Sequence, residues 1–216
     1  MPSPERLLIF GASGHGRVVA EAAAAAGLAP AGWADDDPDR RGSRVDGLEV
    51  LACGTAEAAE IALEAGWSVV VAVGDNRARR RVMLELAALG AQLATVVHPR
   101  ATISPTARLG EGSVALAGVV INAGAQVGSN VILNTSCSVD HDCRIGDHAH
   151  LSPGVHLGGA VEVGEGTHLG VGVSVRNQIK IGAWSLVGAG AAVVSDIDPG
   201  VVAWGVPAKP QRRLGS

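Results

Sequence analysis

Cysteine is scarce in this sequence of 216 residues, and the cysteines present follow no known ligand or disulfide spacing. Cys53, Cys137 and Cys143 are an odd number and contain no CxxC pair. They therefore provide neither a disulfide framework nor a zinc ribbon. We expect reduced thiols in a cytoplasmic protein.

Blocks of positive charge and long apolar segments are lacking too. The net charge is −4, and the one cluster of arginines, residues 77–81, lies on an expected helix. No general surface for polyanions is thus indicated, and nucleic acid is not an expected partner. The apolar run 7–10 is too short for the core of a signal peptide, and polar residues interrupt the uncharged stretch 113–139. We expect no membrane partner.

Residues 1–98 alternate strand and helix signals. The apolar run Leu7–Phe10 leads into GASGHG and then into VVAEAAAAAG, which indicates a strand, a turn and a helix that ends at Gly27. Further elements are expected at Ala31–Ala34 (strand), Thr55–Ala65 (helix), Val69–Val73 (strand) and Asn76–Leu89 (helix). Thr55 and Asn76 are the expected caps of the last two helices. Such alternation predicts a Rossmann-like α/β domain with a parallel sheet.

The second half of the chain keeps a strict period of six. An apolar residue occurs every six residues from Ile103 to Val193, at sixteen positions without a gap. Glycine follows at intervals of eighteen, at Gly110, Gly128, Gly146, Gly164 and Gly182. This pattern predicts a triangular coil of three short strands per turn, with the apolar residue pointing inward and glycine supplying backbone freedom at a corner.

The repeat resembles that of the hexapeptide-repeat acyltransferases, which forms a left-handed parallel β-helix. GASGHG, ILNTSCSVDHDC, GDHAHLSPGV and the terminal GVPAK together resemble the sugar acetyltransferases of bacterial surface-glycan pathways. Most similar are the N-acetyltransferases that act on nucleotide-linked 4-amino-4,6-dideoxy sugars, such as GDP-perosamine or the UDP-linked sugar of the bacillosamine pathway. The resemblance implies an acetyl-CoA co-substrate, no metal and a homotrimer. It divides the chain into a nucleotide-sugar-binding domain (1–98), a β-helix (99–196) and a segment that covers coenzyme A (197–216).

Four of the seven histidines fall within VDHDCRIGDHAHLSPGVH, residues 139–156. His150 and His168 are eighteen residues apart, so we expect them to stack on successive coils. A solvated face is the simplest explanation for His148 and His156. A zinc site has less support, because metal-binding hexapeptide trimers use two histidines five residues apart and this chain has no such pair.

By resemblance, the histidine of the VxHxC segment, His141, is the catalytic base. An imidazole with a pKa of about 6.5 can accept the proton that an amine loses in acyl transfer. Asp142 matches the acidic neighbour of this histidine in the family, and Asp140 is the alternative partner of the ring. The resemblance also implies that Asn134 contacts the acceptor and that His150 contacts the acceptor or the acetyl group. It further implies that the backbone N–H of Gly159 faces the oxyanion, and a plain corner of the coil is the alternative for this glycine.

GASGHG follows a strand and opens a helix, an arrangement whose unpaired N–H groups attract phosphate. Its spacing is GxxGxG rather than GxGxxG, so a dinucleotide-dependent oxidoreductase is weakly supported. By resemblance, the residues that bind the nucleotide sugar are Gly11, Ser13, Gly14, His15, Asp35 and Asp36. A solvated turn before Pro38 is the alternative for the two aspartates.

Coenzyme A carries phosphates, so basic residues are expected where it leaves the β-helix, and Lys180, Lys209, Arg212 and Arg213 are candidates. By resemblance, its pantetheine arm runs between two neighbouring β-helices. The expected contacts of coenzyme A are Gly159, Gly170, Gly188, Ala189 and Lys209. Two alternatives stay open: O-acetylation of a sialic acid, and a non-catalytic β-helix subunit that binds a nucleotide.

Overall fold

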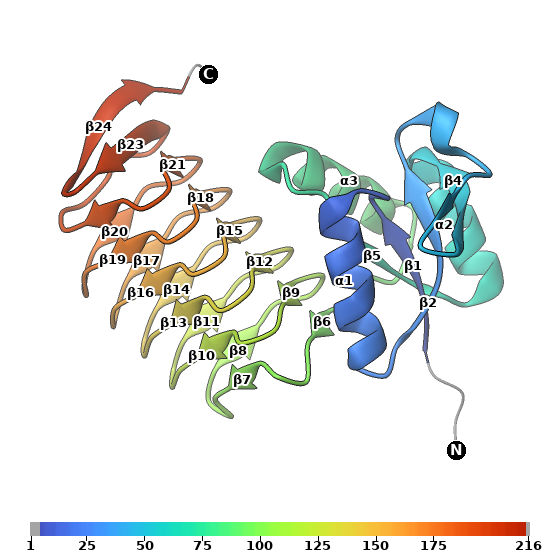
Figure 1. Ribbon diagram of the computed structural model, residues 1–216, viewed down its shortest axis with the longest axis horizontal. Coiled ribbons are helices and arrows are strands. Elements are labelled where there is room, and N and C mark those ends of the chain that lie inside the picture. The colour runs from blue at the N-terminus through green and yellow to red at the C-terminus, as the bar shows by residue number, and fades with distance from the viewer. Residues whose placement is uncertain (1–4, 215–216) are drawn as a thin grey trace. The chain divides into compact units, whose positions relative to one another are not determined.

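The computed structural model describes residues 5–214, and the chain divides into two compact units, Met1–His98 and Pro99–Ser216. Each unit has its own architecture (Figure 1).

The first unit is a small α/β domain. Its elements are β1 (Arg6–Phe10), α1 (Gly14–Ala25), β2 (Ala29–Asp35), the 3₁₀ helix η1 (Pro38–Arg40), β3 (Arg44–Val45), β4 (Leu48–Cys53), α2 (Gly54–Ala65), β5 (Ser68–Val71), α3 (Asn76–Ala88) and β6 (Val96–Val97). One sheet has the order β3-β4-β2-β1-β5, and only the β3–β4 pair is antiparallel. The strand order reverses at β1, as in a Rossmann fold, so the predicted fold class of this domain is confirmed.

Both predicted helix caps in this domain are wrong by one or two residues. Cys53 is the N-cap of α2, where its backbone N–H bonds to Glu57 instead, and Thr55 lies inside the first turn. Asp75 caps α3, because its Oδ1 lies 2.8 Å from the backbone nitrogen of Ala78. A capping side chain reaches the N–H three residues later, and Asp75 rather than Asn76 stands at that distance.

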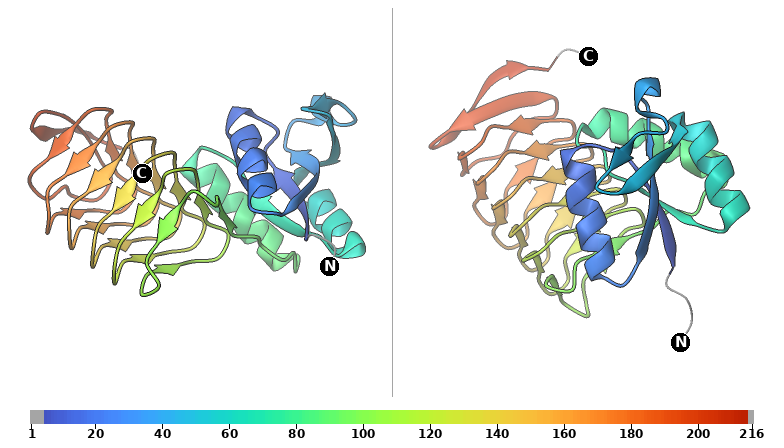
Figure 2. Two further views of the ribbon diagram at one scale, coloured as in Figure 1. Left: turned by 60° about the horizontal axis from the view of Figure 1, so that its bottom comes forward. Right: turned by 45° about the vertical axis from the view of Figure 1, so that its right-hand side comes forward.

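The second unit is a parallel β-helix of short strands (Figures 1 and 2). Strands β7 to β22 contain two residues each: Thr102–Ile103, Arg108–Leu109, Val114–Ala115, Val120–Ile121, Gln126–Val127, Ile132–Leu133, Ser138–Val139, Arg144–Ile145, His150–Leu151, His156–Leu157, Glu162–Val163, His168–Leu169, Ser174–Val175, Lys180–Ile181, Leu186–Val187 and Ala192–Val193. A final antiparallel hairpin pairs β23 (Val201–Gly205) with β24 (Ala208–Arg213).

The predicted sixfold register is confirmed, because each repeat position is the second residue of one of these strands. Every third strand pairs in parallel, which makes three faces: β7-β10-β13-β16-β19-β22, β8-β11-β14-β17-β20, and a third face running from β9 through β12, β15, β18 and β21 to the hairpin. The repeat residues are buried except for the half-buried Ile103 and Leu109 at the first coil. Each strand contributes one buried apolar residue, and these residues form the core of the prism together with the small residues two positions earlier.

The predicted role of the glycines at the corners is wrong. Gly110, Gly128, Gly146, Gly164 and Gly182 do not have positive φ angles. A Cβ at any of them would lie within 2.3–2.5 Å of the next coil, so these positions need glycine because neighbouring coils approach closely. The left-handed residues stand elsewhere, at six-residue intervals, and include Asn130, Asp142 and His148.

Candidate functional site

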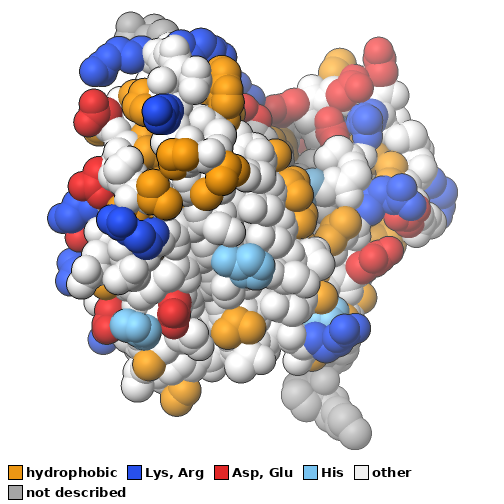
Figure 3. All heavy atoms as spheres, turned by 60° about the vertical axis from the view of Figure 1, so that its left-hand side comes forward, with side chains coloured by type: hydrophobic (Ala, Val, Ile, Leu, Met, Phe, Trp, Pro, Cys, Tyr) orange, Lys and Arg blue, Asp and Glu red, His pale blue; other side chains and the backbone are white. Residues whose placement is uncertain are grey.

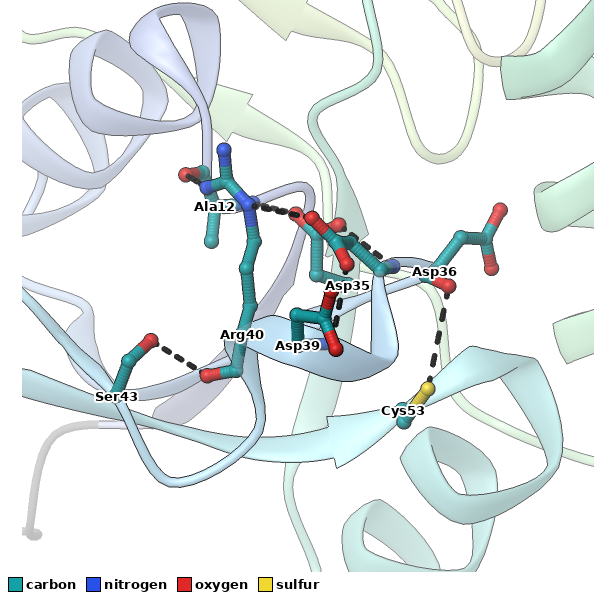
Figure 4. Close-up of polar contacts among 8 residues, drawn as sticks. Ala12, Asp35, Asp36, Asp39, Arg40, Ser43 and Cys53 are labelled. Atoms are coloured by element: carbon teal, nitrogen blue, oxygen red, sulfur yellow. Dashed lines mark hydrogen bonds and ion pairs between the residues drawn. The ribbon is translucent and has the colours of Figure 1, made fainter.

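The glycine loop between β1 and α1 is held in place by the end of β2. The backbone nitrogen of Ala12 lies 2.8 Å from Oδ2 of Asp35, and the backbone nitrogen of Asp37 lies 3.0 Å from Oδ1 of the same carboxylate. Arg40 extends from η1 and donates to the carbonyl oxygen of Ala12 (Figure 4). Because both Asp35 oxygens accept from the backbone, this side chain has a clear structural task in shaping the loop.

A cavity of about 230 Å³ opens beside this loop, at the carboxyl ends of β1, β2 and β5. We call it the glycine-loop cavity, and its lining residues are Phe10, Gly11, Ser13, Asp35, Asp36, Ala72, Val73 and Gly74. Ligands of open α/β sheets bind in such a crevice, where the strand order reverses. Four of the six predicted residues therefore lie together, whereas Gly14 and His15 belong to the first turn of α1 and are not among the lining residues.

The first turn of α1 leaves its capping hydroxyl available. Ser13 is the N-cap residue, but its side chain makes no capping hydrogen bond. His15 is half-buried, and burial together with the charge of Arg79 lowers its pKa to about 4. The His15 imidazole is therefore neutral at physiological pH.

Two arginines near this cavity were not predicted. Arg40 contacts the loop itself, and Arg81 of α3 lies 3.1 Å from Oδ2 of Asp36. The cluster 77–81 was visible in the sequence, but its partner is 45 residues away and carries no local signal.

In the β-helix, His141 stands at the corner that follows β13. Its Nδ1 lies 2.9 Å from Oδ2 of Asp142, and both side chains are exposed. Of the two predicted partners of the ring, Asp142 is therefore the one in contact. The pKa of His141 is raised, mainly by this hydrogen bond and then by the charge of Asp140.

Asp140 acts on the backbone instead. Its Oδ1 accepts from the backbone nitrogen of His141 at 2.8 Å and from Nδ2 of Asn122, one coil earlier, at 2.9 Å. These bonds lower the pKa of Asp140. Asn122 was not predicted, although its distance of eighteen residues from Asp140 could have revealed it.

The His141 hollow has a volume of about 500 Å³ and is lined by Asp140, His141, Gly158, Gly159, Ala160, Val175, Arg176, Asn177 and Gln178. Gly159 packs directly against the imidazole, since a Cβ at this position would lie 2.5 Å from Nε2. The structure thus brings together His141, Asp142 and Gly159 from the predicted set. Arg176, Asn177 and Gln178 were not singled out from the sequence.

The remaining predicted residues belong to the third face of the prism. Nδ2 of Asn134 lies 3.4 Å from Nε2 of His150, and the His150 and His168 rings stack with centroids 4.5 Å apart, as predicted. Ser152 adds a 2.9 Å contact from Oγ to Nε2 of His168. The third face thus carries a row of polar side chains on successive coils, and this row is separate from the His141 corner.

Of the two histidines expected on a solvated face, only His156 is exposed. His148 is buried, with Nδ1 2.9 Å from Nδ2 of Asn130, so that prediction was wrong for His148. Its left-handed corner conformation turns the ring onto the preceding coil, where Asn130 adopts the same conformation.

The predicted coenzyme contacts other than Gly159 also follow the third face. A Cβ at Gly170 would lie 2.7 Å from the backbone nitrogen of Ala189, and a Cβ at Gly188 would lie 2.8 Å from Cβ of Trp204. Both glycines are therefore needed for coil stacking. Ala189 and the hairpin residue Lys209 are exposed.

Neither metal ligands nor membrane-spanning helices were found among residues 5–214. No three His, Cys, Asp or Glu side chains are grouped there as a metal site requires. No helix in that range has the length and hydrophobicity needed to cross a bilayer.

Comparison with known proteins agrees with this architecture. Residues 6–86 match the PglD N-terminal domain family. The acetyltransferase domain of PglB from Neisseria gonorrhoeae FA1090, solved with acetyl coenzyme A, is 41% identical over 96% of this chain and 100% of that chain, with a TM-score of 0.88. PerB from Caulobacter crescentus, solved with CoA and GDP-perosamine, is 42% identical over 95% of this chain and 97% of that chain, with a TM-score of 0.89.

A third structure, WeeI from Acinetobacter baumannii AYE, is 22% identical over 96% of this chain and 100% of that chain, has a TM-score of 0.82 and supports the fold alone. With two solved relatives above 40% identity over nearly the whole chain, this protein belongs to the family of hexapeptide-repeat sugar N-acetyltransferases that includes the PglB acetyltransferase domain and perosamine N-acetyltransferase.

Proposed function

We propose that this chain transfers the acetyl group of acetyl-CoA to the C4 amine of a nucleotide-linked 4-amino-4,6-dideoxy sugar, either GDP-perosamine or a UDP-linked analogue. The observation that carries the proposal is the His141 ring, held by Asp142 in a hollow faced by Gly159. The ligands of the relatives support it, since PglB was solved with acetyl-CoA and PerB with GDP-perosamine. Perosamine N-acetyltransferase was also solved with a histidine replaced by asparagine or alanine.

The proposed base is Nε2 of His141. When Nδ1–H donates to Asp142, Nε2 carries the free lone pair. The amine nitrogen attacks the thioester carbonyl carbon and loses its proton to Nε2. The tetrahedral intermediate then collapses as the C–S bond breaks, and the leaving thiolate takes the proton from the imidazolium. The base supplies ~10²-fold, because a neutral amine is already nucleophilic.

No covalent acetyl-enzyme is required for this transfer. Cys137 and Cys143 are buried in the prism, and burial raises the pKa of Cys137 to about 12 and also raises that of Cys143. A protonated, buried thiol is a poor nucleophile. We therefore propose direct transfer, with the N–H of Gly159 facing the oxyanion.

The nucleotide half of the acceptor is assigned to residues 1–98. In this proposal the diphosphate lies at Gly11, Ser13, Gly14 and His15, where α1 begins, and Asp35 or Asp36 faces the base or ribose. The free Ser13 hydroxyl and the neutral His15 support this assignment, since both can hydrogen-bond a ligand.

A homotrimer would complete the site. His141 and Gly159 lie at the corner after β13 and β16, whereas Asn134, His150, Gly170, Gly188, Ala189 and Lys209 follow the third face of the same prism. A neighbouring protomer could place its third face against the His141 corner, with acetyl-CoA between them and residues 197–216 covering it. Figure 3 shows hydrophobic side chains gathered on one face of the molecule. The large exposed hydrophobic side chains of residues 171–206 are Val171, Leu186, Val194, Trp204 and Val206. Such a patch is typical of a protein interface.

A free-thiol assay with acetyl-CoA and a panel of nucleotide-linked 4-amino sugars tests the function. We expect thiol release with at least one GDP- or UDP-linked amino sugar. His141→Ala should lower turnover about 10²-fold at neutral pH and recover part of it at high pH, because more of the amine is then neutral. His156→Ala, an exposed histidine bonded to Ser138 outside the hollow, is the matched control and should keep wild-type turnover.

Four results would contradict the proposal or one of its parts. Thiol release with hydroxyl acceptors alone would point to O-acetylation, and absence of release with every acceptor would remove the enzymatic function. Undiminished turnover of His141→Ala at neutral pH would remove His141 as the base. Sedimentation of the protein as a monomer would refute the trimeric arrangement. We also propose that the reaction takes place in the cytoplasm.

A further inference from the structure

Arg79 is a fully buried arginine in the first unit. It belongs to α3 and is among the largest side chains with no exposed surface. Burial lowers the pKa of Arg79 to about 10, with the charge of Asp75 acting in the opposite direction, so the guanidinium remains charged near neutral pH. A buried charge is costly unless hydrogen bonds compensate it, so the position of this group calls for a specific role.

The guanidinium turns back toward the chain that precedes its own helix. Its Nη1 lies 3.1 Å from the carbonyl oxygen of Val73 and 3.3 Å from that of Gly74. Both residues line the glycine-loop cavity. Asp75 caps α3 immediately afterwards, so the segment 73–75 is held on both sides.

This segment has little freedom to move without changing the cavity. A Cβ at Gly11 would lie 2.7 Å from the carbonyl oxygen of Ala72, which shows how closely the strand end after β5 packs on the glycine loop. Loss of the Arg79 bonds would leave the carbonyl oxygens of Val73 and Gly74 without this donor. The backbone of these two residues, which lines the cavity, would then be free to move.

The charge of Arg79 also acts on His15. It acts with burial to keep His15 neutral, and His15 lies in the first turn of α1, where we place the diphosphate. A neutral imidazole has one donor and one acceptor nitrogen. Arg79 therefore influences both the wall of the cavity and the protonation of a proposed ligand contact.

We propose that Arg79 is a positioning residue for the nucleoside diphosphate of the acceptor: its guanidinium holds the Val73–Gly74 backbone in the place that walls the binding cavity. The inference rests on the proposed function, because it assigns the cavity to a nucleoside diphosphate. Arg79 acts through this backbone and is not assigned a contact with the reacting atoms.

The test uses Arg79→Met, Arg79→Lys and the control Arg44→Met in the full-length protein. Arg44 also donates to a backbone carbonyl, that of Gly47 at 2.9 Å, but it is exposed and does not line the cavity. GDP and UDP binding is measured by calorimetry, KM and kcat are measured for both substrates, and the melting temperature is recorded for each variant.

We expect Arg79→Met to weaken binding of the preferred diphosphate at least ten-fold and to raise KM for the nucleotide sugar similarly. KM for acetyl-CoA and kcat at saturation should stay within two-fold of wild type. Arg79→Lys should recover part of the affinity, because an ammonium keeps the charge and can reach one carbonyl. Arg44→Met should bind like wild type.

Unchanged diphosphate affinity in Arg79→Met would overturn the inference and leave the proposed function intact. A lowered melting temperature with equal changes in both KM values would also overturn it, since that pattern indicates a purely structural role. If Arg79→Met does not fold, the test depends on Arg79→Lys. Wild-type affinity of Arg79→Lys for the diphosphate would then overturn the inference that Arg79 acts by bonding both carbonyl oxygens. Failure of the wild-type protein to bind either diphosphate would remove the proposed function and this inference together.

Discussion

Replacing Gly159 by alanine should move the catalytic imidazole. The backbone of Gly159 is outside the left-handed region, so alanine is tolerated there conformationally. The new Cβ would lie 2.5 Å from Nε2, 2.6 Å from Cε1 and 3.2 Å from Cδ2 of His141. Ordinary contact begins near 3.4 Å, so the ring must move by roughly 1 Å, which strains its 2.9 Å bond to Asp142.

A displacement of that size near reacting atoms can cost about 10²-fold in rate, or about 2.7 kcal/mol in the activation free energy. We therefore expect kcat of Gly159→Ala in the free-thiol assay to fall by about that factor. The pH dependence of kcat should change as well, because a ring separated from Asp142 loses the hydrogen bond that raises its pKa. The acid limb of the profile should move to lower pH.

Gly146→Ala is the control for damage to the coil. Its Cβ would lie 2.5 Å from the backbone nitrogen of Glu165, a clash of the same size that does not involve His141. We expect a lower melting temperature but wild-type kcat for the folded protein. Wild-type kcat and an unshifted pH profile in Gly159→Ala would refute the reasoning that this glycine sets the position of the ring.

Two further predictions concern protonation. In wild-type protein the hydrogen bond of Asp142 raises the pKa of His141 above its usual 6.5, so turnover falls as the pH drops below that raised value. In Asp142→Asn, where asparagine also accepts the left-handed conformation, this fall in turnover should move to lower pH. A fall in kcat at the same pH as in wild type would contradict the assignment of Asp142 as the partner of the ring. Iodoacetamide at about pH 8 should label Cys53 in the native protein and spare Cys137, whose burial raises its pKa to about 12; native labelling of Cys137 in a mass spectrum would disprove its burial.

The sequence predicts the β-helix well because one physical requirement repeats along it. Each strand must bury one apolar residue, and this single constraint fixes the register from Ile103 to Val193. The stacking of His150 on His168 follows from the same period. The Rossmann-like domain was predicted from the alternation of its elements, whereas its exact helix caps depended on which side chain reaches a given N–H.

The six-residue repeat could not predict contacts that depend on the direction in which a side chain points. Asp140 and Asp142 flank His141 equally in sequence, and only the left-handed corner at Asp142 decides which carboxylate meets the ring. His148 was misplaced for the same reason, since its corner conformation turns it onto Asn130. Long-range partners such as Arg81 and Asp36 leave no periodic signal at all.

The eighteen-residue turn limits how such a prism can change in length during evolution. Gain or loss of eighteen residues adds or removes a whole coil, about 4.8 Å of length, and leaves each later side chain on its own face. Gain or loss of six keeps the apolar column inward but rotates every later residue to the next face. Such a change between His141 and Gly159 would part the imidazole from the glycine that packs on it, so the reaction centre restricts insertions more tightly than the core does.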